Sequence, residues 1–222
     1  MDKALAPFDA IRLPEFPIAQ KSAPFVVAIE GPNGVGKSTL CAALAAALDA
    51  PNCLGTDPAW TSEPFKTRMI RDADWLASAL FFVSGCLEQM RILNQTAKAA
   101  GTRLIIMDRS LWSTLAVHAS HSTERLARLA AMLSPVVHDI RIPNLTLVLQ
   151  ASFETCQERI AKKSGVARAL DELTATAEFH LREREFYHWL ARQNPTVEFI
   201  MAESRTPKEV AVAALARIRQ LC

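Results

Sequence analysis

The chain has 222 residues, of which half are hydrophobic and 22% are charged, and its formal net charge is +2. This composition is typical of a soluble globular domain and argues against a disordered chain. The charge excess is too small to indicate a surface for a nucleic-acid polymer, which would need clustered Lys and Arg. We therefore expect a cytoplasmic protein of one ordinary domain, with neither a nucleic-acid polymer nor a membrane as a partner.

The cysteines and the first residues indicate the class of protein but no catalytic or binding site. The five cysteines form no C-x-x-C pair, so the sequence indicates neither a disulfide framework nor a zinc site. Residues 1–23 contain acids and prolines where a secretory signal needs an unbroken apolar run, and no later segment reads as long and apolar enough to cross a bilayer. We expect residues 1–23 to form an N-terminal arm, either packed or loose, and residues 24–222 to form the domain.

In chain order, residues 25–30 form a short apolar run that ends at glycine, which is typical of a buried parallel strand. An alanine- and leucine-rich segment then stops at Pro51, as a helix would. Four more strands are predicted, at residues 59–64, 102–108, 144–150 and 196–202. Helices are predicted at residues 38–50, 74–100, 111–134, 152–163, 170–193 and 206–222. This alternation predicts an α/β, doubly wound fold, a five-stranded parallel sheet with helices on both faces.

Residues 29–40 read IEGPNGVGKSTL and carry the strongest motif. Gly31-x-x-x-x-Gly36-Lys37-Ser38 matches the Walker A pattern, directly after a predicted strand and at the start of a predicted helix. An ordinary glycine turn is the alternative, but motif and context together favour ATP. Backbone N–H groups would surround the phosphates, Lys37 would reach the β and γ phosphates, and Ser38 would bind a bridging Mg²⁺. The predicted nucleotide-binding residues are Gly31, Asn33, Gly34, Val35, Gly36, Lys37, Ser38 and Thr39.

Other residues restrict the phosphate chemistry. The D-x-x-G and N-K-x-D strings of a GTPase do not occur in the sequence. Many P-loop ATPases place a glutamate after the strand-end aspartate, but here Arg109 follows Asp108. A cation at that place suits a phosphate or a charged transition state better than it suits activation of water. The sequence therefore predicts phosphoryl transfer to an organic hydroxyl or phosphate.

From about Phe25 to its end, the chain resembles the thymidylate kinase family, with the deoxynucleoside kinases next. The segments that carry the resemblance are IEGPNGVGKSTL, TSEP at residues 61–64, MDRS at 107–110, PNLTLVLQAS at 143–152 and EFHLREREFYHWLA at 178–191. The resemblance implies a P-loop kinase fold with a lid at about residues 159–170. It also implies ATP and Mg²⁺, transfer to a pyrimidine deoxynucleotide (dTMP to dTDP), and a possible homodimer.

The resemblance also implies roles for residues beyond the phosphate loop. Closure of the lid would bring Arg159, Lys163 or Arg168 against the transferring phosphoryl group, although a solvated basic loop is the alternative. Asp108 would contact Mg²⁺, and Arg109 would contact the 5′ end of the acceptor. Glu63 would be the base in a deoxynucleoside kinase or part of the pocket in a thymidylate kinase, unless it is an exposed loop residue.

Three departures from the family pattern keep other functions open. The long predicted helix lacks the family's acceptor-binding arginine, and Arg91 either reaches toward the same pocket or lies on the surface. Asn33 stands where the family has an acid, and Ser110 stands where thymidylate kinases prefer an aromatic residue. The alternatives are a deoxynucleoside kinase that phosphorylates a 5′-hydroxyl, and a nucleotide-binding regulator without kinase turnover.

A few more side chains have two interpretations each. Phe81, Phe82 and Trp112 either stack on a base or belong to the core. Gln89 either reads a pyrimidine edge or is exposed. His118 and the histidine three residues after it have no third ligand nearby, so we expect a plain helix surface there rather than a metal site.

Overall fold

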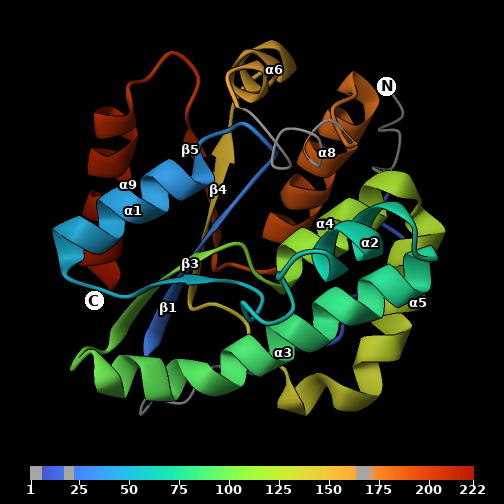
Figure 1. Cartoon of the computed structure of the whole chain (residues 1–222), viewed down its shortest axis with the longest axis horizontal. Coiled ribbons are helices and arrows are strands. Elements are labelled where there is room, and N and C mark those ends of the chain that lie inside the picture. Colours follow the sequence, from blue (N-terminus) through green and yellow to red (C-terminus); the bar gives the residue numbers. More distant parts are fainter. Residues whose placement is uncertain (1–6, 18–22, 164–170, 172) are drawn as a thin grey trace.

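The computed structural model describes residues 7–17, 23–163, 171 and 173–222. Its strands are β1 (Phe25–Glu30), β2 (Asn52–Leu54), β3 (Leu104–Asp108), β4 (Leu145–Gln150) and β5 (Val197–Met201). They form one parallel sheet in the order β2-β3-β1-β4-β5 (Figure 1). The predicted five-stranded parallel sheet is therefore confirmed. Its strand order reverses direction at β1, and this is where open α/β sheets bind ligands.

The second strand is not where the sequence predicted it. Residues 59–64 form turns, in which the Trp60 N–H donates to Asp57 O at 2.9 Å. The edge strand β2 instead covers Asn52–Leu54 and pairs with the end of β3, with Asn52 opposite Ile106. A strand of three residues has too little sequence for a recognisable alternation, and only its pairing with β3 defines it.

Helices cover both faces of the sheet. They are α1 (Lys37–Leu48), α2 (Phe65–Arg71), α3 (Trp75–Ala99), α4 (Leu111–His121), α5 (Thr123–Leu133), a 3₁₀ helix (Ser134–Asp139), α6 (Phe153–Ala161), α8 (Ala177–Gln193) and α9 (Pro207–Leu221). Alternate residues of β1 divide the core. Val27 and Ile29 pack into the cluster with α1 and α9, whereas Val26 and Ala28 pack into the cluster with α3.

Two predicted helices differ from the observed ones. The helix expected over residues 111–134 is two helices, because Ser122 has extended backbone and its Oγ accepts hydrogen bonds from the N–H groups that begin α5. The helix expected from residue 170 begins at Ala177, where the hydroxyl of Thr176 caps it. Most of the predicted lid, residues 164–170, lies outside the described residues.

Helix α3 corrects a further expectation. It has 25 residues and a mean hydropathy of 1.3 in its most apolar window, which makes it long and apolar enough to cross a membrane by length and composition alone. In this fold it is a helix of the domain. Asp74 caps its first turn, and Leu93 and Ala97 are buried against β3 and β1.

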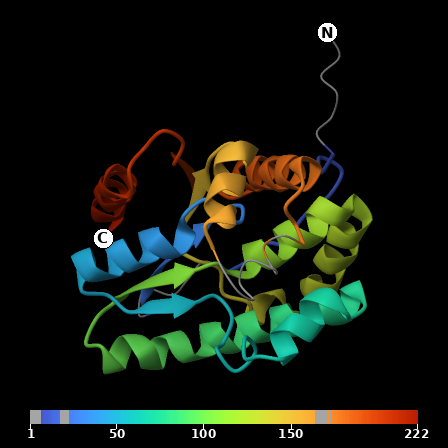
Figure 2. The same cartoon turned by 45° about the horizontal axis from the view of Figure 1, so that its top comes forward.

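Residues 7–17, which we call the strap, pack against the outer side of α4 and α8. Phe8 is 1% exposed, and Ile11 is buried in the same cluster. Figure 2 shows the strap in dark blue beside α8. Of the two forms that we expected for the N-terminal arm, the packed one therefore describes residues 7–17.

Candidate active site

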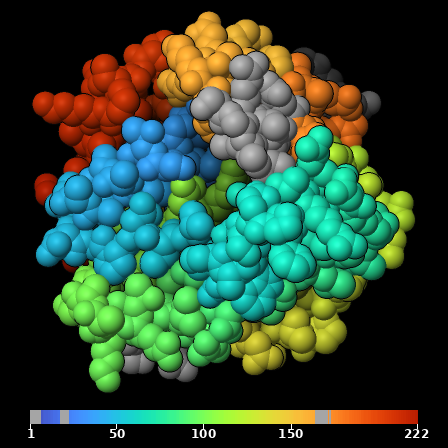
Figure 3. Space-filling view, viewed as in Figure 1, coloured from blue at the N-terminus to red at the C-terminus, as the bar shows by residue number. Residues whose placement is uncertain are grey.

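A cavity of about 1090 Å³ lies at the carboxyl edge of the sheet. Residues 33–40 line one end of it, and residues of α2, α3 and α4 line the other. Figure 3 shows the surface hollowed between α1, in blue, and α2, in turquoise. The cavity is large enough to hold two small ligands end to end, since single ligand pockets begin at about 300 Å³.

The loop between β1 and α1 needs glycine at two positions. Gly31 has φ 123° and Gly34 has φ 81°, a region that side chains with a Cβ rarely adopt. A Cβ on Gly31 would lie 2.5 Å from the carbonyl oxygen of Leu149, and one on Gly34 would meet the carbonyl oxygen of Cys156. The motif thus fixes a loop whose backbone packs directly on β4 and α6 while its amides remain beside the cavity.

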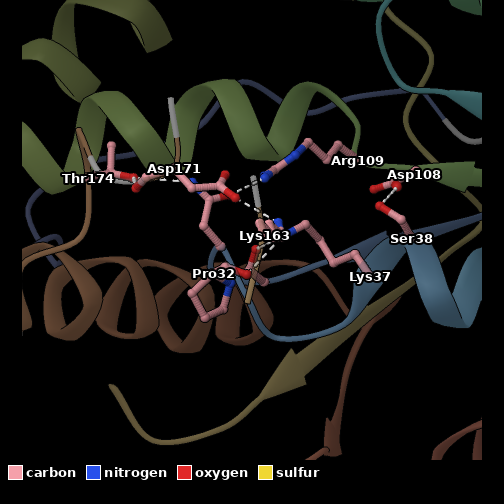
Figure 4. Close-up of polar contacts among 10 residues, drawn as sticks. Pro32, Lys37, Ser38, Asp108, Arg109, Lys163, Asp171 and Thr174 are labelled. Carbon is pink, nitrogen blue, oxygen red and sulfur yellow. Dashed lines mark hydrogen bonds and ion pairs between the residues drawn. The ribbon is translucent and has the colours of Figure 1, made fainter. Parts of the chain in front are cut away.

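Lys37 begins α1 and is 6% exposed. Its ammonium donates to the carbonyl oxygens of Gly31 at 2.7 Å and Pro32 at 2.8 Å. Burial, and then the nearby Arg109 guanidinium, lower the pKa of Lys37 to about 8, while carboxylates that include Glu183 oppose this shift. The loop's own carbonyls therefore hold the ammonium beside the position that the motif assigns to the phosphates (Figure 4).

Ser38 and Asp108 meet on the cavity wall. The Ser38 hydroxyl donates to Asp108 Oδ2 at 2.6 Å, and this contact joins the first turn of α1 to the last residue of β3 (Figure 4). A hydroxyl and a carboxylate are hard oxygen donors, which suit Mg²⁺ bound through few protein ligands plus substrate phosphates and water. The residues present therefore fit this ion.

Arg109 follows β3 with a left-handed backbone, φ 72°. Its guanidinium donates to Asn33 Oδ1 of the phosphate loop and to Ser113 Oγ at 3.3 Å. Burial lowers the pKa of Arg109, but the carboxylates of Asp108, Glu30 and Glu183 outweigh burial and raise it. Figure 4 shows the head groups of Lys37 and Arg109 close together, with the Ser38–Asp108 pair apart from them.

Glu30, the last residue of β1, was not predicted as a site residue from the sequence. It is completely buried and accepts hydrogen bonds from Ser110 Oγ at 2.6 Å, from Ser113 Oγ and from the Tyr187 hydroxyl at 2.9 Å. Burial raises the pKa of Glu30, and these hydroxyls work against that shift. A charged residue at the end of an otherwise apolar strand was the available signal.

Glu183 was not predicted from the sequence either. It is 4% exposed and lines the cavity from α8, four residues before Tyr187. Burial raises its pKa, whereas Lys37 and Arg109 lower it. One face of α8 thus brings a carboxylate and a hydroxyl to the base of the phosphate loop, a pairing at helical spacing that is visible in the sequence.

The predicted lid residues are placed as far as the structure describes them. Arg159 lines the cavity, and its guanidinium donates to the carbonyl oxygens of Val35 at 2.8 Å and Ala202 at 3.3 Å. Lys163 also lines it and pairs with Asp171 at 2.6 Å (Figure 4). Arg168 lies outside the described residues.

Two of the expected acceptor contacts are not at the cavity. Glu63 is exposed and is absent from the cavity lining, which matches the exposed-loop alternative. Arg91 points to solvent, with its side chain 60% exposed, and pairs with Glu88 at 2.6 Å, so it does not replace the missing arginine. Both expectations for Gln89 are wrong, because it is 2% exposed and does not line the cavity.

The loop before α2 packs against α3. Gly85 has no room for a Cβ, because Thr56 and Trp60 lie against it. The Trp60 indole donates to Ser84 Oγ at 2.9 Å. This packing leaves Phe82 and Ser78 as the α3 side chains that face the cavity beyond Trp75.

Helix α4 supplies the remaining wall and includes a correction. His118, which we expected on a helix surface, is 5% exposed and lines the cavity. Burial, followed by the charges of Arg125 and His121, lowers the pKa of His118 to about 4, so its ring is neutral at pH 7. Trp112 belongs to the core, at 1% exposure. Within the described ranges, no three His, Cys, Asp or Glu side chains group as metal ligands.

Comparisons with known proteins agree with this geometry. The thymidylate kinase family model matches residues 29–213. A thymidylate kinase of Cereibacter sphaeroides is 30% identical over 209 residues, which cover 87% of this chain and 94% of that protein. Among solved structures, a thymidylate kinase from Candida albicans has a TM-score of 0.66 at 19% identity, over 89% of this chain and 92% of that one.

A deoxyadenosine kinase from M. mycoides, solved with bound dATP, has the same TM-score of 0.66 at 16% identity and covers 88% of this chain and 100% of that one. At these identities the solved structures establish the fold, which is that of the P-loop nucleotide and deoxynucleoside kinases. The family match spans most of the sequence and includes both the phosphate loop and the Asp108–Arg109 pair. The chain therefore belongs to the thymidylate kinase family and is a nucleotide kinase, a phosphotransferase.

Proposed function

We propose that the protein transfers the γ-phosphoryl group of Mg²⁺-bound ATP to a pyrimidine deoxynucleotide, converting dTMP to dTDP. The observation that carries this proposal is the shared cavity, in which the phosphate loop with Lys37 lies at one end and Arg109 lies beside it, facing the wall of α4. ATP is the phosphate donor in this family. dTMP is the acceptor that the names of the curated relatives imply.

The donor end binds the triphosphate. Ser38 and Asp108 would hold Mg²⁺, which would supply positive charge for the transferring phosphoryl group. Lys37 exchanges its two loop carbonyls for phosphate oxygens, so its bonds in the free protein are replaced rather than lost. Arg159, held against the loop at Val35, adds charge on the side from which the lid segment starts. These residues position groups and neutralise charge, which is most of what phosphoryl transfer requires.

The acceptor end favours a phosphate over a hydroxyl nucleophile. A phosphate oxygen of the acceptor attacks the γ phosphorus, the bond from that phosphorus to the β-bridging oxygen breaks, and ADP leaves with the electron pair. A phosphate monoester is largely a dianion at pH 7, since its second pKa is about 6. It needs no base to remove a proton. The proposed base of the hydroxyl reaction, Glu63, is exposed and outside the cavity lining, which supports a nucleotide acceptor.

A deoxynucleoside kinase is the second candidate, because the described part of α3 brings no arginine to the cavity. A regulator that binds nucleotide without turnover is the third. One experiment separates the three: ADP release is followed with Mg²⁺ and ATP while dTMP, dUMP, dCMP, thymidine, deoxycytidine and deoxyadenosine are offered singly. We expect ADP release that dTMP stimulates. Stimulation by a nucleoside alone would support the second candidate, and thermal stabilisation by ATP without ADP release would support the third.

We also propose that the protein is cytoplasmic and forms a homodimer through α3. All five cysteines are free thiols. Leu80 of α3 is 44% exposed, and the resemblance implies packing through long helices. Analytical ultracentrifugation tests the second point, and a sedimentation coefficient of a monomer at micromolar concentration would reject it.

A further inference from the structure

The strap lies before residue 29, where the match to the family model begins, yet it shares a core with the helices of the active site. Its Phe8 ring lies edge-on to Phe186 with centroids 6.1 Å apart, and 5.8 Å from the Trp189 ring. Asp9 pairs with Arg192 at 2.7 Å. Residues 8 and 9 are therefore fastened to the second half of α8.

The other end of the strap is fastened to the first turn of α4. The Phe16 ring lies edge-on to Trp112 at 5.3 Å. Trp112 is the second residue of α4. Its backbone N–H donates to the hydroxyl of the helix cap, Ser110, at 3.2 Å. Ser110 directly follows Arg109, so Phe16 packs on the turn that carries this arginine into the cavity.

The inner sides of the same two helix segments meet at one buried carboxylate. Tyr187, next in sequence to Phe186, donates to Glu30 at 2.9 Å. Ser110 and Ser113, on either side of Trp112, also donate to Glu30. Ser113 in turn accepts a hydrogen bond from Arg109. Each end of the strap thus packs on an aromatic residue whose neighbour in the chain bonds to Glu30.

We propose that the strap is a positioning segment for Arg109. It holds the start of α4 and the second half of α8 against β1, so that the three hydroxyls converge on Glu30 and Ser113 fixes the guanidinium at the cavity. Because the role of Arg109 as the acceptor contact belongs to the proposed function, this inference rests on that function. An aromatic edge contact of this kind holds two rings in a defined orientation, which a general apolar contact would not do.

The competing explanation is that the strap adds stability and nothing else. If the strap adds stability alone, a substitution in it lowers the melting temperature and leaves the properties of each folded molecule unchanged. A positioning role weakens acceptor binding and turnover in molecules that are fully folded. It spares ATP, because the phosphate loop packs on β4 and α6 and the loop's own carbonyls hold Lys37. The two explanations therefore differ in the acceptor parameters at temperatures far below melting.

The decisive variant is Phe16→Ala in the full chain. The control is Leu181→Ala, because Leu181 is 53% exposed on α8 and belongs neither to the cavity lining nor to the hydrophobic cluster that contains Phe8. Calorimetry gives the dissociation constant for dTMP, and steady-state kinetics give kcat/KM for dTMP and KM for ATP. We expect about a tenfold loss in both acceptor parameters for Phe16→Ala, with KM for ATP within about twofold of wild type. The Phe16→Leu variant keeps most of the apolar contact but loses the edge-on ring, so it is expected to recover only part of the loss.

A double-mutant cycle identifies the residue through which the strap acts. In an Arg109→Lys background, Phe16→Ala is expected to cost less than twofold, because the group that it positions is already altered. Wild-type dTMP affinity and kcat/KM in a folded but less stable Phe16→Ala protein would overturn the inference, and so would fully additive losses. If Phe16→Ala does not fold, Phe16→Leu alone and in the Arg109→Lys background decides by the same criteria.

The inference and the proposed function fail separately. A wild-type protein that binds dTMP but releases no ADP would refute the proposed function, while the calorimetric comparison would still decide the role of the strap. Should the panel of acceptors select another ligand, that ligand takes the place of dTMP in the same measurements.

Discussion

The two ends of the cavity are formed by different kinds of contact. At the donor end, short main-chain contacts fix the phosphate loop and its lysine: Gly31 and Gly34 pack on neighbouring backbone, and loop carbonyls hold Lys37. At the acceptor end, side chains determine the shape of the cavity. His118 lines its wall, and Trp60 supports this wall by packing against Gly85. A backbone site follows from a local motif, whereas a side-chain site can be rebuilt while the fold stays the same.

The largest effect should follow from a change at the donor end. Lys37→Ala is expected to lower kcat by at least about a hundredfold, since one preorganised charge beside a transferring phosphoryl group is worth that much. The melting temperature should stay equal or rise, because a buried ammonium with a lowered pKa costs stability in the free protein. ADP release and thermal melting measure both effects. Turnover close to wild type would remove Lys37 from the mechanism.

At the acceptor end, Arg109→Lys tests the nearest cation. We expect kcat/KM for dTMP to fall about tenfold or more, because the donors of an ammonium share one nitrogen, whereas the planar guanidinium reaches Asn33 and Ser113 from two nitrogens and keeps further N–H groups for a phosphate. KM for ATP should change by less than about threefold. The matched control is Arg91→Lys on α3, an exposed residue paired with Glu88, which should leave both constants unchanged. An equal loss for ATP and dTMP would contradict the division into two ends.

Gly85→Ala tests the packing behind the acceptor wall. Its Cβ would meet Thr56 and Trp60, and this overpacking should cost about 1–3 kcal/mol in the free energy of unfolding, despite the better helix propensity of alanine. ATP binding, measured by calorimetry, should survive. Gly101→Ala is a useful comparison, because no atom lies within 4 Å of the added Cβ although φ is 65°. A Gly85→Ala protein as stable as wild type would mean that the loop at Trp60 moves away freely.

The smallest expected effect is a pH dependence from His118. Its folded-state pKa is about 4, below the unfolded value of about 6.5, so the unfolded chain binds more protons between these values. The stability that depends on neutral His118 is complete above about pH 6.5 and is lost as the pH falls toward 4. Between pH 7 and 5.5 the loss should be about 1 kcal/mol in urea unfolding. His118→Gln should reduce the measured slope by this amount, with a remainder from His121, His180 and His188, whose pKa values burial also lowers. The exposed control His138→Gln should leave the slope unchanged. An unchanged slope in His118→Gln would show that another group titrates.

Particular residues show how far the sequence could be read. Gly31, Lys37 and Ser38 were recognisable because strand, turn and helix follow one another locally, and the strand-end Asp108 met Ser38 as the parallel sheet requires. Glu63 and Arg91 each had two interpretations in the sequence, because helical phase and loop path determine whether a side chain reaches a cavity, and both are exposed. Glu30 and Glu183 were missed because burial of a carboxylate depends on hydroxyls and cations from distant helices.

The sequence by itself determined the parallel sheet, the phosphate loop and the side of the sheet on which both ends of the cavity lie, because periodicity and glycine spacing act over a few neighbouring residues. Only the tertiary structure decided what forms the acceptor wall, which carboxylates lie beneath the cations, and that the strap packs on α4 and α8. These features are contacts between segments far apart in the chain. No local pattern encodes them, since they depend on how whole helices pack.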